Sequence, residues 1–227
     1  NHNNTRSSLQ MNINDFDKLN KKIDLDYLKN NFLILKPMTD LSTVLKKFLN
    51  TQDLITSEDI LTQITQECIE DAYHEGIKIL ELRWAPTFIQ LNHPHLSFEK
   101  ILNAIRKGKQ NCSHLPIAVG FIGIIQRTLG LNTAHEVTDF ILSNKNDFIG
   151  IDLADDELHA PAISFVEVFK KAQQANLPIT IHAGEALDPR SIQNVIDAVT
   201  ILGARRIGHG LQIIHDEKAM NFIKNEK

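Results

Sequence analysis

The stretch that decides the fold, residues 178–185, reads PITIHAGE. The three residues after the proline are apolar or β-branched, which favours a strand, and Gly184 ends that run. His182 and Glu185 stand at the point where the predicted strand ends. A strand needs neither an imidazole nor a carboxylate for its own stability. The pair therefore indicates a chemical role.

Similar apolar segments recur along the chain and alternate with amphipathic ones. Predicted strands begin near residues 77, 117, 148, 179 and 206, and spacings of roughly 27–40 residues fit one βα unit each. The strands are apolar on both faces, which is typical of a parallel sheet covered by helices. This leaves an open doubly wound sheet and a (β/α)8 barrel as alternatives. No glycine-rich phosphate-binding motif follows a predicted strand, which disfavours a nucleotide-binding open sheet.

The helix predicted over residues 57–75 illustrates the amphipathic segments. Thr56 with Asp59 supplies an N-terminal capping pattern, and Thr133 with Glu136 forms a capping box for a later predicted helix. Steps of three and four residues give the first of these helices one apolar stripe, made of Ile60, Leu61, Ile64, Cys68, Ile69 and Ala72.

Length and composition limit the class of protein. The chain has 227 residues, 42% of them hydrophobic, and a formal net charge of −4, so nothing global attracts nucleic acid or an anionic membrane. Apolar runs such as residues 117–125 are about half of the ~20 residues that a membrane helix needs. No secretory signal opens the sequence. We therefore expect a cytoplasmic protein without a nucleic-acid or membrane partner, and the sequence does not indicate its oligomeric state.

We expect a single domain over residues 1–227. Residues 1–50 would form a helical, lid-like region, and residues 51–227 would supply the βα units of a barrel. Cys68 and Cys112 have no metal-binding spacing, so free thiols in a reducing compartment are expected.

Polar residues gather where each apolar strand ends. In a parallel barrel all these ends meet at one rim, and chemistry in such barrels occurs there. For Arg83, Arg127 and Asp156 the simpler interpretation is favoured, namely that a charge marks where a strand leaves the core. For three others we favour a functional role, because each directly ends a strand and adjoins a glycine or another small residue: His182, Glu185 and His209.

These three residue types suit metal-assisted hydrolysis. A neutral imidazole such as that of His182 is the commonest zinc ligand. A nearby carboxyl such as that of Glu185, which does not bind the metal, can shuttle protons. His209, between two glycines, could orient or deprotonate a water that a metal activates. Two histidines and a glutamate could equally build an acid/base site without metal.

Four strand-end motifs resemble those of the adenosine/AMP deaminase family of zinc-dependent (β/α)8 hydrolases. They are ELRWAP (residues 81–86), GIDLADDE (150–157), HAGE (182–185) and GHG (208–210), and they follow one another in the family's order. The resemblance covers roughly residues 41–210. It implies an α/β fold built as a (β/α)8 TIM-type barrel that is incomplete here. Strands 2–6 are clear, strand 1 is uncertain, and strands 7–8 have no sequence in the chain.

The resemblance also implies the roles of individual residues. His182 would bind Zn²⁺, Glu185 would deliver a proton to the purine N1, and His209 would guide or deprotonate the attacking water. A small-molecule purine would be the partner. The reaction would convert adenosine or a related 6-aminopurine nucleoside or nucleotide to the 6-oxo product and ammonia.

Three departures from the family pattern keep alternatives open. The family begins with an H-x-H pair of metal ligands, and His2 is a candidate for the second of these. The segment that would carry the aspartate ligand after strand eight is absent from the sequence. Asp155 stands where the family has a glycine whose backbone N–H faces the purine. The alternatives are a non-catalytic deaminase-like binding protein or inactive truncated paralogue, and a barrel amidohydrolase acting on another C–N bond.

Overall fold

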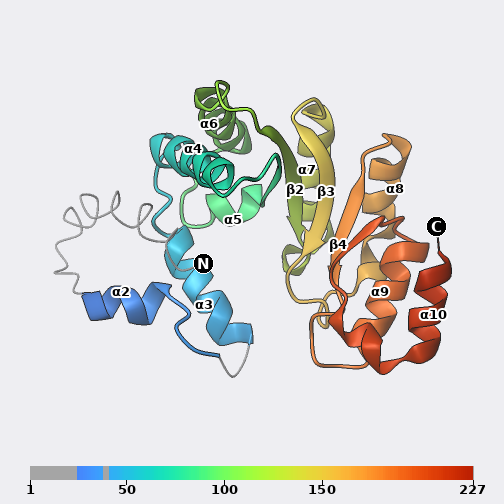
Figure 1. Cartoon of the computed structure of the whole chain (residues 1–227). Helices are drawn as coiled ribbons and strands as arrows, with labels where there is room; N and C mark the ends of the chain where they lie inside the picture. The colour runs from blue at the N-terminus through green and yellow to red at the C-terminus, as the bar shows by residue number, and fades with distance from the viewer. Residues whose placement is uncertain (1–24, 38–40, 227) are drawn as a thin grey trace. The chain divides into compact units, whose positions relative to one another are not determined.

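The computed structural model of the chain describes residues 25–37 and 41–226 (Figure 1). These residues form two compact units. The first takes the residues up to Leu80 together with Ile89–Ala118, and the second takes Glu81–Phe88 together with the residues from Val119 onward. A single barrel domain over the whole chain stays a prediction.

Helices make up most of the first unit. They are α2 (Leu25–Phe32), α3 (Leu41–Gln52), α4 (Glu58–His74) and α6 (Phe98–Asn111), while α5 (Pro86–Gln90) leads into the unit from the second. Helices α4 and α6 pack closely, and the Thr62 hydroxyl donates a hydrogen bond to the Ala104 carbonyl at 3.1 Å. The described part of residues 1–50 is helical as expected, and its role as a lid stays a prediction.

The face of α4 that packs on α6 differs from the predicted stripe. Leu61 and Ile69 are buried as expected, but Cys68 is exposed. The buried face takes in Thr62 and Thr65 instead. With Ile69 and Ala72 these two threonines form a stripe at steps of three and four residues, so the same spacing also fits a stripe that leaves Cys68 out.

Two predicted helix caps are wrong. Ser57, not Thr56, caps α4, and its Oγ accepts the Ile60 N–H at 3.3 Å. Helix α7 (Gly130–Ser143) begins three residues before Thr133, so the expected capping box lies inside the helix. Hydroxyl residues at neighbouring positions compete for one helix start, and only the backbone conformation decides between them.

A five-stranded sheet in the order β1-β2-β3-β4-β5 lies in the second unit, apart from the first residues of β1 and β2. Its strands are β1 (Ile79–Trp84), β2 (Ala118–Gln126), β3 (Phe148–Ala154), β4 (Ile179–Ala183) and β5 (Arg206–His209). The pairs from β2 to β5 are parallel. The strands follow chain order without the reversal that an open doubly wound sheet has. The α/β fold with five consecutive strands of an incomplete barrel is thus confirmed, and β1–β5 are the predicted strands 2–6.

Helices cover one face of this sheet (Figure 1). They are α7, α8 (Val166–Gln174) and α9 (Arg190–Thr200), and α10 (Glu217–Asn225) follows β5 and packs against α9. Leu153 and Ile181 are fully buried among the apolar side chains of this unit. Because side chains alternate along a strand, the residues next to them, Asp152 and His182, face the opposite side. The strand pattern thereby places a carboxylate and an imidazole on one face.

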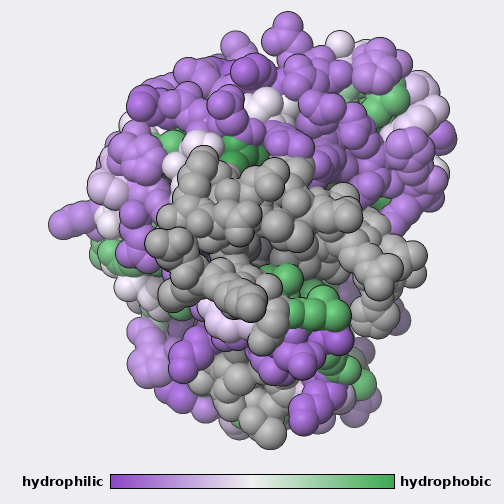
Figure 2. All heavy atoms as spheres, turned by 90° about the vertical axis from the view of Figure 1, so that its left-hand side faces the viewer, coloured by the Kyte–Doolittle hydropathy of each residue, from purple (hydrophilic) through white to green (hydrophobic). Residues whose placement is uncertain are grey.

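The surface that Figure 2 draws is mainly hydrophilic. Among its coloured residues, hydrophilic side chains predominate and the apolar ones lie in small separate patches. No helix in the described part of the chain is long and apolar enough to cross a membrane.

The close approach of α4 and α6 can be tested at Gly108. A Cβ at this position would lie 2.5 Å from the Thr62 carbonyl oxygen and 2.6 Å from the Thr65 Cβ. Gly108→Ala should therefore lower the free energy of unfolding by about 1–3 kcal/mol. At an open helix position the same change would raise it by about 1 kcal/mol. Urea unfolding followed by circular dichroism measures the effect.

Lys107→Ala, at the exposed neighbouring position on α6, is the matched control and should leave the unfolding midpoint nearly unchanged. An unchanged or higher midpoint for Gly108→Ala would contradict the close packing of the two helices.

Candidate active site

The side chain of His182 is fixed by a buried carboxylate on the neighbouring strand. Its Nδ1 lies 3.1 Å from Oδ1 and 3.0 Å from Oδ2 of Asp152, whose side chain is fully buried. Asp152 also accepts a hydrogen bond from Arg83 Nη1 at 2.8 Å. An ionised carboxylate only accepts hydrogen bonds, so Nδ1 of His182 carries the proton. Nε2 is then left as an unprotonated nitrogen that can bind a metal or a substrate proton.

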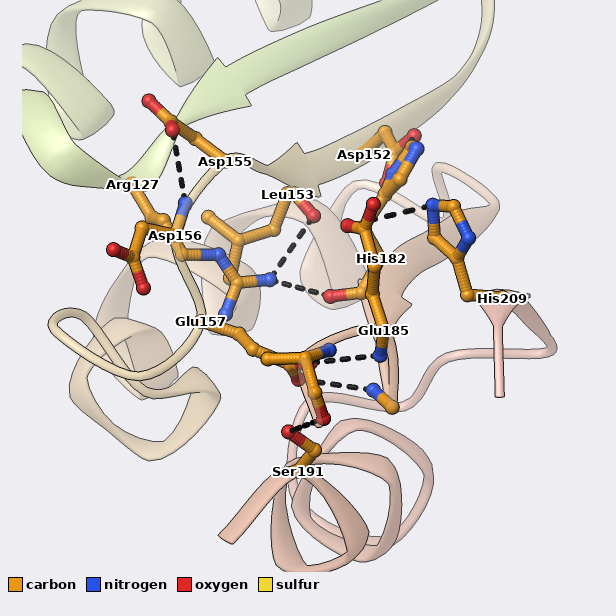
Figure 3. Close-up of polar contacts among 12 residues, drawn as sticks. Arg127, Asp152, Leu153, Asp155, Asp156, Glu157, His182, Glu185, Ser191 and His209 are labelled. Atoms are coloured by element: carbon orange, nitrogen blue, oxygen red, sulfur yellow. Dashed lines mark hydrogen bonds and ion pairs between the residues drawn. The ribbon is translucent and has the colours of Figure 1, made fainter. Parts of the chain in front are cut away.

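Glu185 and His209 lie beside this imidazole (Figure 3). Oε2 of Glu185 is 3.5 Å from Nε2 of His209, and about a third of each side chain is exposed. The rings of His182 and His209 are 5.4 Å apart between centroids. The structure thus brings together the three residues that the sequence singles out, one from β4, one from the loop after it and one from the end of β5.

Tight turns produce this convergence. Gly184 has φ of +73°, and a Cβ there would lie 2.8 Å from Val195 Cγ2 and 3.0 Å from Gly210 Cα. The turn after β4 therefore packs directly on the turn after β5. His209 itself has φ of +68°, a left-handed conformation that costs a non-glycine residue about 1–2 kcal/mol. Strain of this kind gathers at functional sites.

Arg127 is a central residue of the site, and its role is one that the sequence interpretation missed, because it took this charge only to mark where a strand leaves the core. It is 1% exposed, and its guanidinium donates to the carbonyls of Leu153 at 3.2 Å, His182 at 2.6 Å and Ala160 at 3.1 Å. Burial lowers the pKa of Arg127 to about 10, against the opposing effect of nearby carboxylates, the first being Glu157. The group is therefore charged at neutral pH and ties the ends of β3 and β4 together.

Glu157 was also missed, although it lies in a quoted motif. It is buried and accepts hydrogen bonds from the backbone N–H groups of residues 184–186. One signal in the sequence could have indicated both residues, namely the excess of carboxylates at the end of β3. Carboxylates that are buried need a cation and hydrogen-bond donors nearby. Asp156, by contrast, is partly exposed and pairs with His159, as its simpler interpretation expects.

Asp155 adopts φ of +87°, a conformation that glycine favours. Its carboxylate accepts hydrogen bonds from the Thr128 hydroxyl and, at 2.9 Å, from the Asp156 N–H. Figure 3 shows this carboxylate pointing away from His182, Glu185 and His209. A role for the Asp155 backbone in substrate binding stays a prediction.

The described residues do not by themselves form a metal centre. Among them, no group of three or more histidine, cysteine, aspartate or glutamate side chains is placed to hold a metal ion. His182 alone fits a ligand role, because Asp152 leaves its Nε2 free. His2, the second predicted ligand, lies outside the described residues. A zinc site therefore stays a prediction.

Comparisons with known proteins agree on one family. A sequence model described as adenosine deaminase matches residues 17–227. The adenosine deaminase of Yersinia pseudotuberculosis is 34% identical over 205 residues, which are 90% of this chain and 60% of that protein. The chain thus spans about 60% of the length of that curated relative.

Two solved structures give the fold. An amidohydrolase from Burkholderia ambifaria with bound zinc has a TM-score of 0.77 and 23% identity, covering 91% of this chain and 56% of its own. The protein ADAL from Arabidopsis in complex with IMP has a TM-score of 0.70 and 26% identity, covering 82% of this chain and 55% of its own.

The role of Arg127 is open to a stability test. Arg127→Met should lower the free energy of unfolding by about 3 kcal/mol, because three carbonyls lose their charged donor while buried carboxylates lose a cation. Arg190→Met is the matched control: this side chain is mostly exposed and forms an ion pair with Asp188, so little change is expected. Equal unfolding midpoints for the two variants would contradict the account of Arg127.

Proposed function

Because the chain belongs to the adenosine deaminase family, we propose that the whole protein hydrolyses adenosine or a related 6-aminopurine nucleoside or nucleotide to the 6-oxo product and ammonia. The observation that carries this proposal is the convergence of His182, Glu185 and His209 at the ends of adjacent parallel strands. The complex of ADAL with IMP supports a small-molecule purine as partner.

The carboxyl of Glu185 would give its proton to the purine N1 while water adds to C6 through its oxygen. His209, whose Nε2 is 3.5 Å from the Glu185 carboxylate, would orient that water and accept its proton. His209 then passes this proton to the 6-amino group, which leaves as ammonia, and the second proton of the water returns to the Glu185 carboxylate as the 6-oxo group forms. Each role needs a group within hydrogen-bond reach of the reacting atom, and the short distance between the two side chains supports these roles.

Zinc, when bound, would lower the pKa of a water molecule and so supply the nucleophile at neutral pH. His182 would be one of its ligands, with Asp152 holding the ring in the tautomer that leaves Nε2 free. His2 is a further proposed ligand. The zinc-bound amidohydrolase from Burkholderia ambifaria supports zinc as the metal.

A deaminase-like binding protein without activity is the second candidate. It is favoured by Asp155, a charged residue in a strained conformation beside the site. A full-length protein that holds no zinc after loading, releases no ammonia and still binds a purine would support this candidate over the first.

Glu185→Gln tests the proton-donor role in the full-length protein. The change keeps the shape of the side chain but removes its proton, so ammonia release should fall by at least about 10²-fold while the zinc content stays near one per chain. Ammonia release from adenosine and metal analysis measure the two quantities. Glu167→Gln, at an exposed position on α8, is the control. Full activity in Glu185→Gln would defeat the assigned role.

Asp152→Asn tests the orientation of His182. An amide can present its NH₂ to Nδ1 and so favour the wrong tautomer. Zinc affinity, measured by competition with a chelator, should therefore drop about 10–100-fold. Asp139→Asn, which removes an exposed partner of Lys171, should have no effect. Unaltered zinc affinity in Asp152→Asn would contradict the proposal that this carboxylate orients His182 for zinc binding.

A further inference from the structure

One buried carboxylate receives the amide hydrogens of three consecutive residues in the loop after β4. Oε2 of Glu157 accepts the Gly184 N–H at 2.9 Å, and its Oε1 accepts the N–H groups of Glu185 at 2.8 Å and Ala186 at 2.9 Å. Glu157 is 4% exposed. Figure 3 shows its carboxylate facing the backbone of this loop.

The loop has the form of an anion site. Successive backbone N–H groups that converge on one point make a concavity that binds anions. The φ of +73° at Gly184 turns the chain so that these groups converge, and the contacts of Gly184 with Val195 and Gly210 leave no room for a Cβ. Here the anion is a side chain of the protein itself, contributed by the loop after β3.

The position of Glu157 is set independently of the loop. Asn194 on α9, which is 3% exposed, donates from Nδ2 to the Glu157 carbonyl at 3.1 Å. Its Oδ1 accepts the Ala162 N–H at 2.8 Å. A buried amide on a helix thus holds the main chain of Glu157, and the Glu157 carboxylate in turn holds the loop.

The middle one of the three amides belongs to Glu185. With this amide held, the start of the Glu185 side chain is fixed, and its carboxyl reaches to 3.5 Å from His209. Without the carboxylate of Glu157, the N–H groups of residues 184–186 would lose their acceptor, and the loop could then turn away from its present conformation. A displacement of about 1 Å in a reacting group can cost about 10²-fold in rate.

We propose that Glu157 is a positioning residue for the deamination, whose carboxylate fixes the loop of residues 184–186 and through it the carboxyl of Glu185. This inference rests on the proposed function of Glu185 as proton donor. In this role Glu157 acts on the proton donor through the loop and takes no part in the proton transfers.

Glu157→Gln in the zinc-loaded full-length protein tests this role. Glutamine keeps the shape but replaces one acceptor oxygen with an NH₂ donor, which then faces at least one loop amide. We expect kcat to fall about 10–100-fold with KM little changed and zinc content unaltered. Hydrogen exchange of a peptide containing residues 184–186 should be about tenfold faster, while peptides from β2 and α8 keep their rates.

Glu167→Gln is the matched control, since the same chemical change at an exposed site should alter neither kcat nor exchange. Exchange at residues 184–186 that stays as in the wild type would overturn the proposal. A uniform acceleration across all peptides would also overturn it, because that pattern marks a general loss of stability. A rise in KM with kcat unchanged would overturn it as well.

Glu157→Asp covers the case in which the glutamine variant does not fold. It keeps the charge but is one methylene shorter, so the same selective increase in exchange and a smaller loss of kcat are expected, and wild-type values of both would overturn the proposal. If the wild-type protein releases no ammonia, the proposed function fails, while the exchange rates still decide whether Glu157 holds the loop.

Discussion

The guanidinium of Arg127 donates hydrogen bonds to backbone carbonyls at the ends of both β3 and β4. Parallel strands end at one edge of a sheet, and each backbone carbonyl buried there needs a hydrogen-bond donor. A buried cation satisfies two of these carbonyls at once and compensates the carboxylates that surround it. His182 and Glu185 of the candidate active site begin from the strand end that Arg127 bonds, and His209 begins from the end of the adjacent strand β5.

Buried and exposed charged groups have different roles at the carboxyl ends of these strands. Asp152 and Glu157 are buried and act on the protein itself, the first by fixing the ring of His182 and the second by holding the loop that carries Glu185. Glu185 and His209 are each about one third exposed and are thus available to a substrate. An ordered arrangement of reacting groups needs such support, because flexible side chains lose their orientation unless packing and hydrogen bonds fix it.

Much of this arrangement could be predicted from the sequence. Apolar strands at βα spacing gave the parallel sheet, and the residues that end those strands included His182, Glu185 and His209. Periodicity could not decide which hydroxyl caps α4, because that depends on the backbone conformation at the helix start. It also could not show that Cys68 lies outside the buried face, because that depends on how α4 is rotated against α6. The roles of Arg127 and Glu157 could not be predicted for a related reason. A charge after a strand is usually solvated, and only the tertiary fold shows the distant carbonyls and amides that make its burial favourable.

The account depends on Glu185 and His209 facing a purine together. A crystal structure of the zinc-loaded full-length protein with the 6-oxo product bound would measure this directly. We expect the Glu185 carboxyl about 2.6–3.2 Å from the purine N1, with His209 on the side of the ring that carries the 6-oxo group. A purine bound elsewhere, or bound with Glu185 turned away from N1, would contradict the account.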